Sequence, residues 1–218
     1  DTSYLTQAFE VLQRCWHPLL VDHDTFAAEV EKGVVIVGVD KDTKVQGLIT
    51  LFQTGLGEKE LTQTNYHTLR ENLLAQTNLR NGDKIVCISI CVASYQPDKM
   101  WQYGSIPSPS VQEIQDYLAL GADHVFNFHK KSKAGLPGAE LIALLPNSRP
   151  EDTMSLGYNM LMKYPLIPKA PAIEPNENAS LSVQLIETAM AFAQKLGIAE
   201  VYAFSRPAGA YQYFSSKQ

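Results

Sequence analysis

The sequence has few cysteines, no long apolar run and no excess of positive charge. Its three cysteines, Cys15, Cys87 and Cys91, are an odd number without regular spacing. A disulfide framework is therefore not expected. We expect a reducing, cytoplasmic location instead. No run of about 18 apolar residues predicts a membrane-spanning helix, and the first residues lack the pattern of a signal peptide.

The balance of charge is acidic. The chain has 18 Lys and Arg residues against 23 Asp and Glu residues, which gives a formal net charge of −5. Nucleic acids and anionic membrane surfaces bind basic faces, so neither is expected as a partner. A metal site is not expected, because four histidines lack the HxxxH and HxH spacings of zinc ligands: His17, His23, His67 and His124.

The composition is that of a globular protein. The chain has 218 residues, of which 45% are hydrophobic and 19% charged, and this length can bury a sizeable core. Prolines between residues 164 and 179 mark one boundary. They divide the chain into a domain over 1–164, a linker-like stretch over 165–179 and a helix–strand unit over 180–218, expected to pack on the same domain. Because the sequence begins without Met and stops soon after its last predicted strand, we expect it to be a piece of a longer chain.

Apolar periodicity predicts an α/β protein. The strands over 34–39 and 45–52 are expected to pair as an antiparallel hairpin. Helices are predicted over 4–15, 24–33, 58–79, 111–120 and 180–196. Strands are predicted over 34–39, 45–52, 84–93, 123–128, 139–145, 160–164 and 200–205.

A weak internal echo accompanies this pattern. The segments over 69–94 and 185–210 align so that Ser89 matches Ser205 and Tyr95 matches Tyr211. A duplicated unit would produce such matches. The ordinary recurrence of helix–strand units in α/β proteins would produce them as well, so both explanations stay open.

The turn Gln53-Thr-Gly55-Leu-Gly57 follows a predicted strand and opens a predicted helix. Backbone N–H groups at such a helix start, with the helix dipole, form a site suited to a pyrophosphate, and glycine permits its close approach. An ordinary turn also contains two glycines before a helix, so both interpretations stay open.

Four further residues are candidates for a site. His129 ends a predicted strand before a loop with three lysines; there it either transfers protons or is a solvated surface residue. Arg149 either holds a carboxylate through a bidentate contact or staples its own turn. Ser89 either points into a pocket or is a satisfied core hydroxyl. Trp16 either lines an acyl pocket or ends the first helix in the core.

Together these residues resemble a known family. The order of a helix ending in Cys15-Trp16, a β-hairpin, a Gln-Gly-Gly turn opening a helix and a central strand resembles the Gcn5-related N-acetyltransferase (GNAT) superfamily. The segments FNFHKK, Gly138-Ala139, LLPNSRPEDT and LGYNMLMKY resemble the GNAT-like domains of polyketide synthase loading modules. The resemblance covers roughly residues 34–164.

The resemblance implies a fold, a reaction and a set of roles. The fold would be a mixed, mostly antiparallel central sheet flanked by helices. The reaction would be the decarboxylation of malonyl-CoA and the transfer of the acetyl group to the thiol of an acyl carrier protein. His129 and Ser89 would stabilise and protonate the enolate, and Arg149 would orient the carboxylate or thioester. Trp16 would line the acyl pocket, and the Gln53–Gly57 turn would hold coenzyme A, a substrate rather than a resident cofactor.

The sequence also departs from the family. The family's strand motif is Thr-Arg-Cys, whereas this chain has Ser89-Ile90-Cys91 and lacks the arginine. A further strand normally precedes the Gln-x-x-Gly-x-Gly/Ala turn and is not found here, so either a segment is absent between Thr54 and Gly55 or the coenzyme A site is degenerate. The alternatives to an acyltransferase are a non-catalytic scaffold module of a polyketide synthase and an N-acetyltransferase for a small amine.

Overall fold

The computed structural model describes residues 3–16, 22–76, 81–93, 140–146, 158–166, 172–175 and 177–205. Its strands form one six-stranded sheet in the order β1-β2-β3-β6-β5-β4. Neighbouring strands are antiparallel except β3 and β6, which are parallel. The strands are β1 (Val34–Val39), β2 (Val45–Thr54), β3 (Lys84–Val92), β4 (Glu140–Pro146), β5 (Tyr158–Pro165) and β6 (Glu200–Ser205). The expected α/β class, with a mixed and mostly antiparallel sheet flanked by helices, is confirmed.

The helices differ from the sequence prediction in one place. They are α1 (Ser3–Trp16), α2 (His23–Lys32), α3 (Glu58–Thr62), α4 (Tyr66–Ala75) and α8 (Leu181–Lys195). The single helix predicted over 58–79 is wrong, because Asn65 starts a second helix: its side chain accepts a hydrogen bond from the Thr68 N–H over 2.8 Å and so caps α4. The predicted helix over 111–120 and strand over 123–128 lie outside the described residues.

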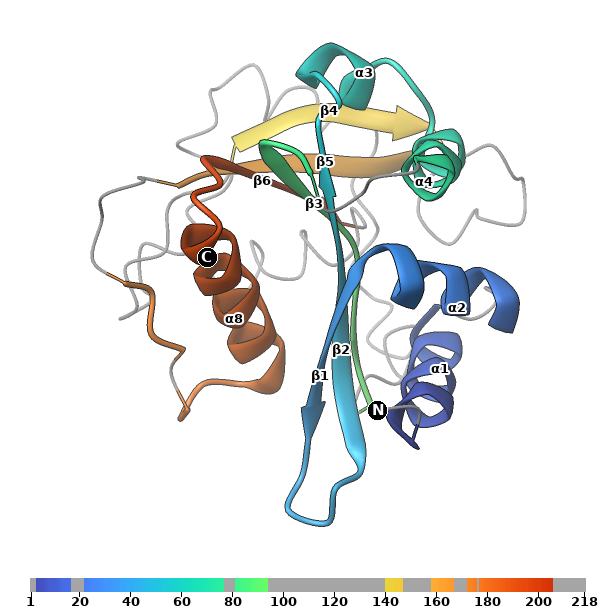
Figure 1. The fold of residues 1–218 in the computed structure, drawn as a ribbon, viewed down its shortest axis with the longest axis vertical. Coiled ribbons are helices and arrows are strands. Elements are labelled where there is room, and N and C mark those ends of the chain that lie inside the picture. Colours follow the sequence, from blue (N-terminus) through green and yellow to red (C-terminus); the bar gives the residue numbers. More distant parts are fainter. Residues whose placement is uncertain are drawn as a thin grey trace, which may run out of the picture.

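The described elements repeat one unit twice. An antiparallel strand pair, a helix and a strand occur as β1-β2, α4 and β3, and again as β4-β5, α8 and β6. The parallel pair runs in register from Lys84 with Glu200 to Cys87 with Ala203, which is the offset that aligns Ser89 with Ser205 in the sequence. Figure 1 shows the β1–β3 half along the long axis and the β4–β6 half lying across it. This repeated arrangement favours an internal duplication over a chance similarity of the two segments.

The two repeated helices cover opposite faces of the sheet. Helix α8 packs against β2 and β3 through one apolar cluster, here the α8 core. Helix α4 packs on the other face in the α4 core, and α1 lies on that same face over β2 in the α1 core. Leu51 and Phe52 show the division, because these adjacent β2 residues belong to the α8 core and the α4 core respectively, as expected for side chains that alternate along a strand.

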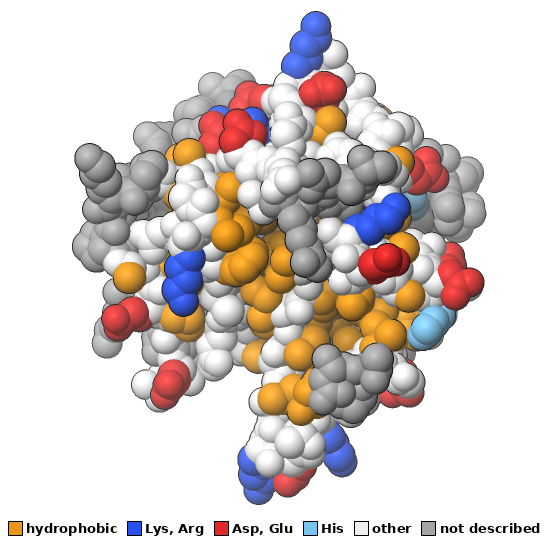
Figure 2. Space-filling view, viewed as in Figure 1, with side chains coloured by type: hydrophobic (Ala, Val, Ile, Leu, Met, Phe, Trp, Pro, Cys, Tyr) orange, Lys and Arg blue, Asp and Glu red, His pale blue; other side chains and the backbone are white. Residues whose placement is uncertain are grey.

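The surface in the view of Figure 1 is mostly polar around an apolar centre. Figure 2 shows hydrophobic side chains gathered between α8 and the α1–α2 pair, while Lys and Arg side chains are scattered around them. In the described part of the chain, no helix is long and apolar enough to cross a membrane.

Candidate functional site

Ser89 lies at a β-bulge in the middle of the sheet. Thr50 and Leu51 are consecutive on β2, but their partners on β3 are Ser89 and Cys87, so Ile88 is the extra residue. The pairing of β3 with β6 extends only as far as Cys87, although both strands continue. The bulge therefore lies where β3 parts from β6, and bulges of this kind re-aim side chains.

Two side chains hold the bulge from opposite faces. The Tyr66 hydroxyl, at the start of α4, donates a hydrogen bond to the Ile88 carbonyl over 3.1 Å. The Cys87 thiol donates to the Ser89 carbonyl over 3.6 Å. The Tyr66 ring also packs edge-on against Phe204, with ring centroids 5.0 Å apart. The backbone of the bulge is thus fixed by contacts, which gives the Ser89 side chain a defined direction.

Two buried hydroxyls at the bulge have no hydrogen-bond partner in the described part of the chain. They are Thr50 Oγ1 and Ser89 Oγ, and the two residues are 0% and 7% exposed. They face each other across β2 and β3, so their side chains lie on the same face of the sheet. An unsatisfied buried hydroxyl costs about 1–3 kcal/mol, so two such neighbours are a candidate place for a ligand that accepts hydrogen bonds.

The surroundings of the two hydroxyls are apolar. Along β2, Leu48 precedes Thr50 and belongs to the α1 core, while Phe52 follows it and belongs to the α4 core. Cys91 on β3 is part of the α1 core, and Ile88 is part of the α4 core. The hydroxyl pair is therefore the polar gap between two apolar clusters on one face of the sheet.

The thiol of Cys87, two residues before Ser89, is not poised as a nucleophile. Burial raises the pKa of Cys87 to about 12, so the thiol stays protonated near neutral pH, and the thiolate is the reactive form. Cys87 also lies in the α8 core, on the face opposite the hydroxyl pair. All three cysteines are buried and form no disulfide.

The Gln53–Gly57 turn uses its polar groups within the fold. The Gln53 side-chain amide donates to the Gly82 carbonyl over 2.7 Å. The Gly57 N–H, at the start of α3, donates to Glu60 Oε2 over 2.7 Å. Glu58 adds a second carboxylate to the first turn of this five-residue helix. Glu58 is paired with Lys163 over 2.9 Å, whereas Glu60 engages the Gly57 N–H that a pyrophosphate would need.

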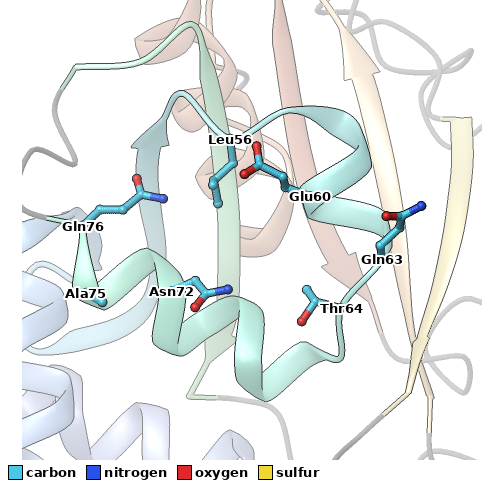
Figure 3. A pocket seen from close by; sticks show the side chains of 7 residues that line it. All are labelled: Leu56, Glu60, Gln63, Thr64, Asn72, Ala75 and Gln76. Atoms are coloured by element: carbon cyan, nitrogen blue, oxygen red, sulfur yellow. The ribbon is translucent and has the colours of Figure 1, made fainter.

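A pocket of about 540 Å³ lies beside this turn, between α3 and α4. Its walls are mainly uncharged amide and hydroxyl side chains, with Glu60 as the one carboxylate, and Figure 3 shows them around the opening between the two helices. The lining residues are Leu56, Glu60, Gln63, Thr64, Asn72, Ala75 and Gln76. None of the predicted site residues is among them.

The structure does not bring all predicted site residues together. His129 and Arg149 lie outside the described residues, and of Trp16 only the backbone is described, as the last residue of α1. Ser89 is separated from the Gln53–Gly57 turn along the paired strands, since Gln53 pairs with Ile85 near the start of β3. Within the described ranges no group of three or more His, Cys, Asp or Glu residues could hold a metal ion.

Sequence reasoning missed Thr50. A threonine in a strand is unremarkable by itself, because Thr favours strands. Thr50 could have been recognised as a polar residue within the apolar run VQGLITLF, at a position whose side chain faces the core. The pairing with Ser89 depends on the register across the β3 bulge, which the sequence does not reveal.

Comparison with known proteins gives a likeness in structure alone. A solved structure, "GphF GNAT-like decarboxylase in complex with isobutyryl-CoA", is similar to the chain with a TM-score of 0.46 and 16% sequence identity, over 74% of this chain and 94% of that chain. Its description names the superfamily that the sequence resembles. No protein-family model matches the chain, and no curated protein matches it. At this identity and TM-score, the likeness assigns neither family membership nor function.

Proposed function

We propose that the chain is an acyltransferase that acts on a short acyl-CoA thioester and that Ser89 binds the thioester. The observation that supports this most directly is the buried, unpartnered Ser89 hydroxyl at the bulge of the central strand. A thioester carbonyl is a neutral acceptor that such a hydroxyl can satisfy, and the apolar clusters beside it suit a short acyl chain. The GNAT-like motifs of the sequence point to the same substrate class.

With malonyl-CoA the proposed reaction has two steps. In the first step the bond between the methylene carbon and the carboxylate breaks, CO2 leaves, and the electron pair remains as an enolate whose charge is on the thioester oxygen. Ser89 donates to that oxygen, and a preorganised donor to developing charge lowers the barrier. A proton then returns to carbon, with His129 as the predicted donor and Arg149 as the predicted holder of the carboxylate.

In the second step the acetyl group passes to the phosphopantetheine thiol of an acyl carrier protein. The carbonyl carbon forms a bond to that thiol sulfur, the bond to the coenzyme A sulfur breaks, and the thiol proton leaves with the released coenzyme A. The same hydroxyl serves here, because charge again develops on the carbonyl oxygen.

Mass spectrometry of the products tests this proposal. The chain is incubated with malonyl-CoA and a carrier protein that bears the phosphopantetheine thiol, and acetyl-CoA and acetyl-carrier protein are quantified. We expect both products from the native chain and from Ser182→Ala, which removes a hydroxyl at the start of α8. A native chain that neither binds coenzyme A thioesters in calorimetry nor consumes malonyl-CoA would overturn the proposal.

One observation favours a second candidate, a non-catalytic GNAT-like module. The Gly57 N–H that a pyrophosphate would need is already bound by Glu60. Gly55→Ala and Gly57→Ala test the turn without disturbing the fold. A Cβ at Gly55 would meet nothing within 4 Å, and one at Gly57 would meet only Glu60 Oε2 at 3.5 Å. These variants should fold normally. A scaffold module binds no coenzyme A, whereas weaker binding by these variants would place the pyrophosphate at this turn.

A further inference from the structure

We propose that Thr50 is a second hydrogen-bond donor to the substrate, so that Thr50 and Ser89 share one acceptor oxygen of the bound acyl group. This inference rests on the proposed function, because the acceptor is the carbonyl oxygen of the thioester. It adds a site residue within β2. The sequence had indicated candidate residues only in the Gln53–Gly57 turn at the end of this strand.

The case for Thr50 begins with the state of its hydroxyl. Thr50 is 0% exposed, and its Oγ1 has no partner in the described part of the chain. Thr54, four residues along the same strand, is also 0% exposed. Its hydroxyl donates to Gln76 Oε1 over 3.1 Å and accepts from the Leu56 N–H over 3.2 Å. Within the described residues, one buried threonine of β2 is thus hydrogen-bonded and the other is not.

The pairing of the strands makes the unsatisfied hydroxyls neighbours. Thr50 and Ser89 are register partners, and the Cβ atoms of such partners are about 4.5–5.5 Å apart. One acceptor oxygen between them can lie about 2.7–2.8 Å from each hydroxyl oxygen, which is the usual O–H···O length. A carbonyl oxygen has two lone pairs and can accept both bonds. Spacing of this order is therefore compatible with one shared acceptor oxygen.

The surroundings select the chemistry of the ligand. The α1 core lies on one side of the hydroxyl pair and the α4 core on the other, so the acceptor is delivered on an apolar group. Two neutral donors stabilise partial negative charge on an oxygen without neutralising a full carboxylate. The ligand class is accordingly a small acyl thioester or its enolate, held through its carbonyl oxygen.

Valine replaces threonine with nearly the same shape, so Thr50→Val and Thr54→Val are matched variants. Removing an unsatisfied hydroxyl should leave the melting temperature unchanged or raise it by a few degrees, whereas removing a satisfied one should lower it. We expect Thr50→Val to lower kcat/KM for malonyl-CoA about 100-fold, as for other donors to a developing oxyanion. Thr50→Ser, which keeps a hydroxyl, should restore most of that activity.

A second readout does not depend on turnover. Acetyl-CoA labelled with ¹³C at its carbonyl is bound to the native chain and to Thr50→Val, and the carbonyl stretch is measured by infrared difference spectroscopy. A lost hydrogen bond should move the band of the bound thioester to higher frequency in Thr50→Val, with Ser182→Ala matching the native chain.

Each result decides the matter. Binding of acetyl-CoA by the native chain, with an upshifted band and reduced turnover in Thr50→Val, supports the inference. An unchanged band, or turnover within twofold of the native chain, overturns the role of Thr50 and leaves the proposed function intact. A melting temperature of Thr50→Val as low as that of Thr54→Val overturns it as well, because the hydroxyl would then have a structural partner such as a buried water. No binding of acetyl-CoA overturns both proposals.

Discussion

The buried ion pair between α2 and α4 gives a sharp test of the packing around the site. The carboxylate of Glu29 accepts hydrogen bonds from Arg70 Nε, over 2.7 Å, and from a terminal nitrogen of the same guanidinium. Glu29 is 1% exposed and the Arg70 side chain 16%. Helix α4 also carries Tyr66, which holds the bulge at Ile88, so this pair anchors the helix that supports the site.

Arg70→Met removes one partner and leaves the other charge buried. Such a loss costs about 3–5 kcal/mol, and each kcal/mol lowers the melting temperature of a chain of this length by about 2–4 °C. We therefore expect a decrease of about 6–20 °C at pH 7. The double variant Glu29→Met with Arg70→Met removes both charges and should recover most of that loss, because apolar replacement of a whole buried pair is often neutral.

The effect depends on pH in a defined direction. Burial raises the pKa of Glu29 above its ordinary value of 4.5, although the charge and hydrogen bonds of Arg70 oppose the rise. The folded chain therefore holds this proton more tightly than the unfolded chain, and stability falls as the pH rises from 4.5 through the raised pKa. Without Arg70 the pKa rises further, so the deficit of Arg70→Met relative to the native chain should be large at pH 8 and small near pH 4.

Thermal unfolding followed by circular dichroism measures these differences for the native chain, both single variants and the double variant. A deficit for Arg70→Met below about 2 °C at pH 7 would show that the carboxylate is not buried as described, since a solvent-exposed ion pair contributes only about 0–1 kcal/mol. An equal deficit at pH 4 and pH 8 would contradict the assignment of the effect to the Glu29 charge.

Two further predictions concern the fold near the Gln53–Gly57 turn. A Cβ at Gly82 would lie 2.0 Å from the Thr54 carbonyl carbon, so Gly82→Ala should lower the melting temperature by roughly 2–12 °C, while Gly55→Ala should leave it unchanged. Lys163 bridges Glu58 and Glu200 at 2.9 and 2.8 Å, so Lys163→Met should lower it by about 1–8 °C at pH 7. Because the Lys163 hydrogen bond lowers the pKa of both carboxyls below 4.5, that loss should shrink as the pH falls from 4.5 through the lowered pKa values; a loss that does not shrink in acid would contradict the network.

Much of the fold could be predicted because its strands are unusual in sequence. The β-branched run VVIVGV and the apolar run KIVCISICV form β1 and β3 with shifts of one residue at most. Gly197, which directly follows the helix predicted over 180–196, has a φ of +70°, which favours glycine. The break before Asn65 was missed because the apolar residues of the two helices continue one periodic pattern, and residues 63–65 between them include neither glycine nor proline.

The site could be predicted only in part. Ser89 was recognisable because it is polar within an apolar strand. Thr50 was not, since its significance lies in a register that the bulge at Ile88 shifts by one residue. The turn at Gly55–Gly57 was predicted from local sequence, but Glu60, three residues into the next helix, occupies the N–H of Gly57. Cross-strand pairing and capping are decided by contacts that a local pattern does not contain.

The central claim is that the Ser89 hydroxyl acts on an acyl-CoA thioester, and kcat/KM for malonyl-CoA in Ser89→Ala tests it most directly. Loss of a donor to the developing oxyanion should lower this value about 100–1,000-fold, while the melting temperature stays equal to that of the native chain or rises, because the lost hydroxyl has no partner among the described residues. A Ser89→Ala variant that turns over malonyl-CoA as fast as the native chain would contradict the account.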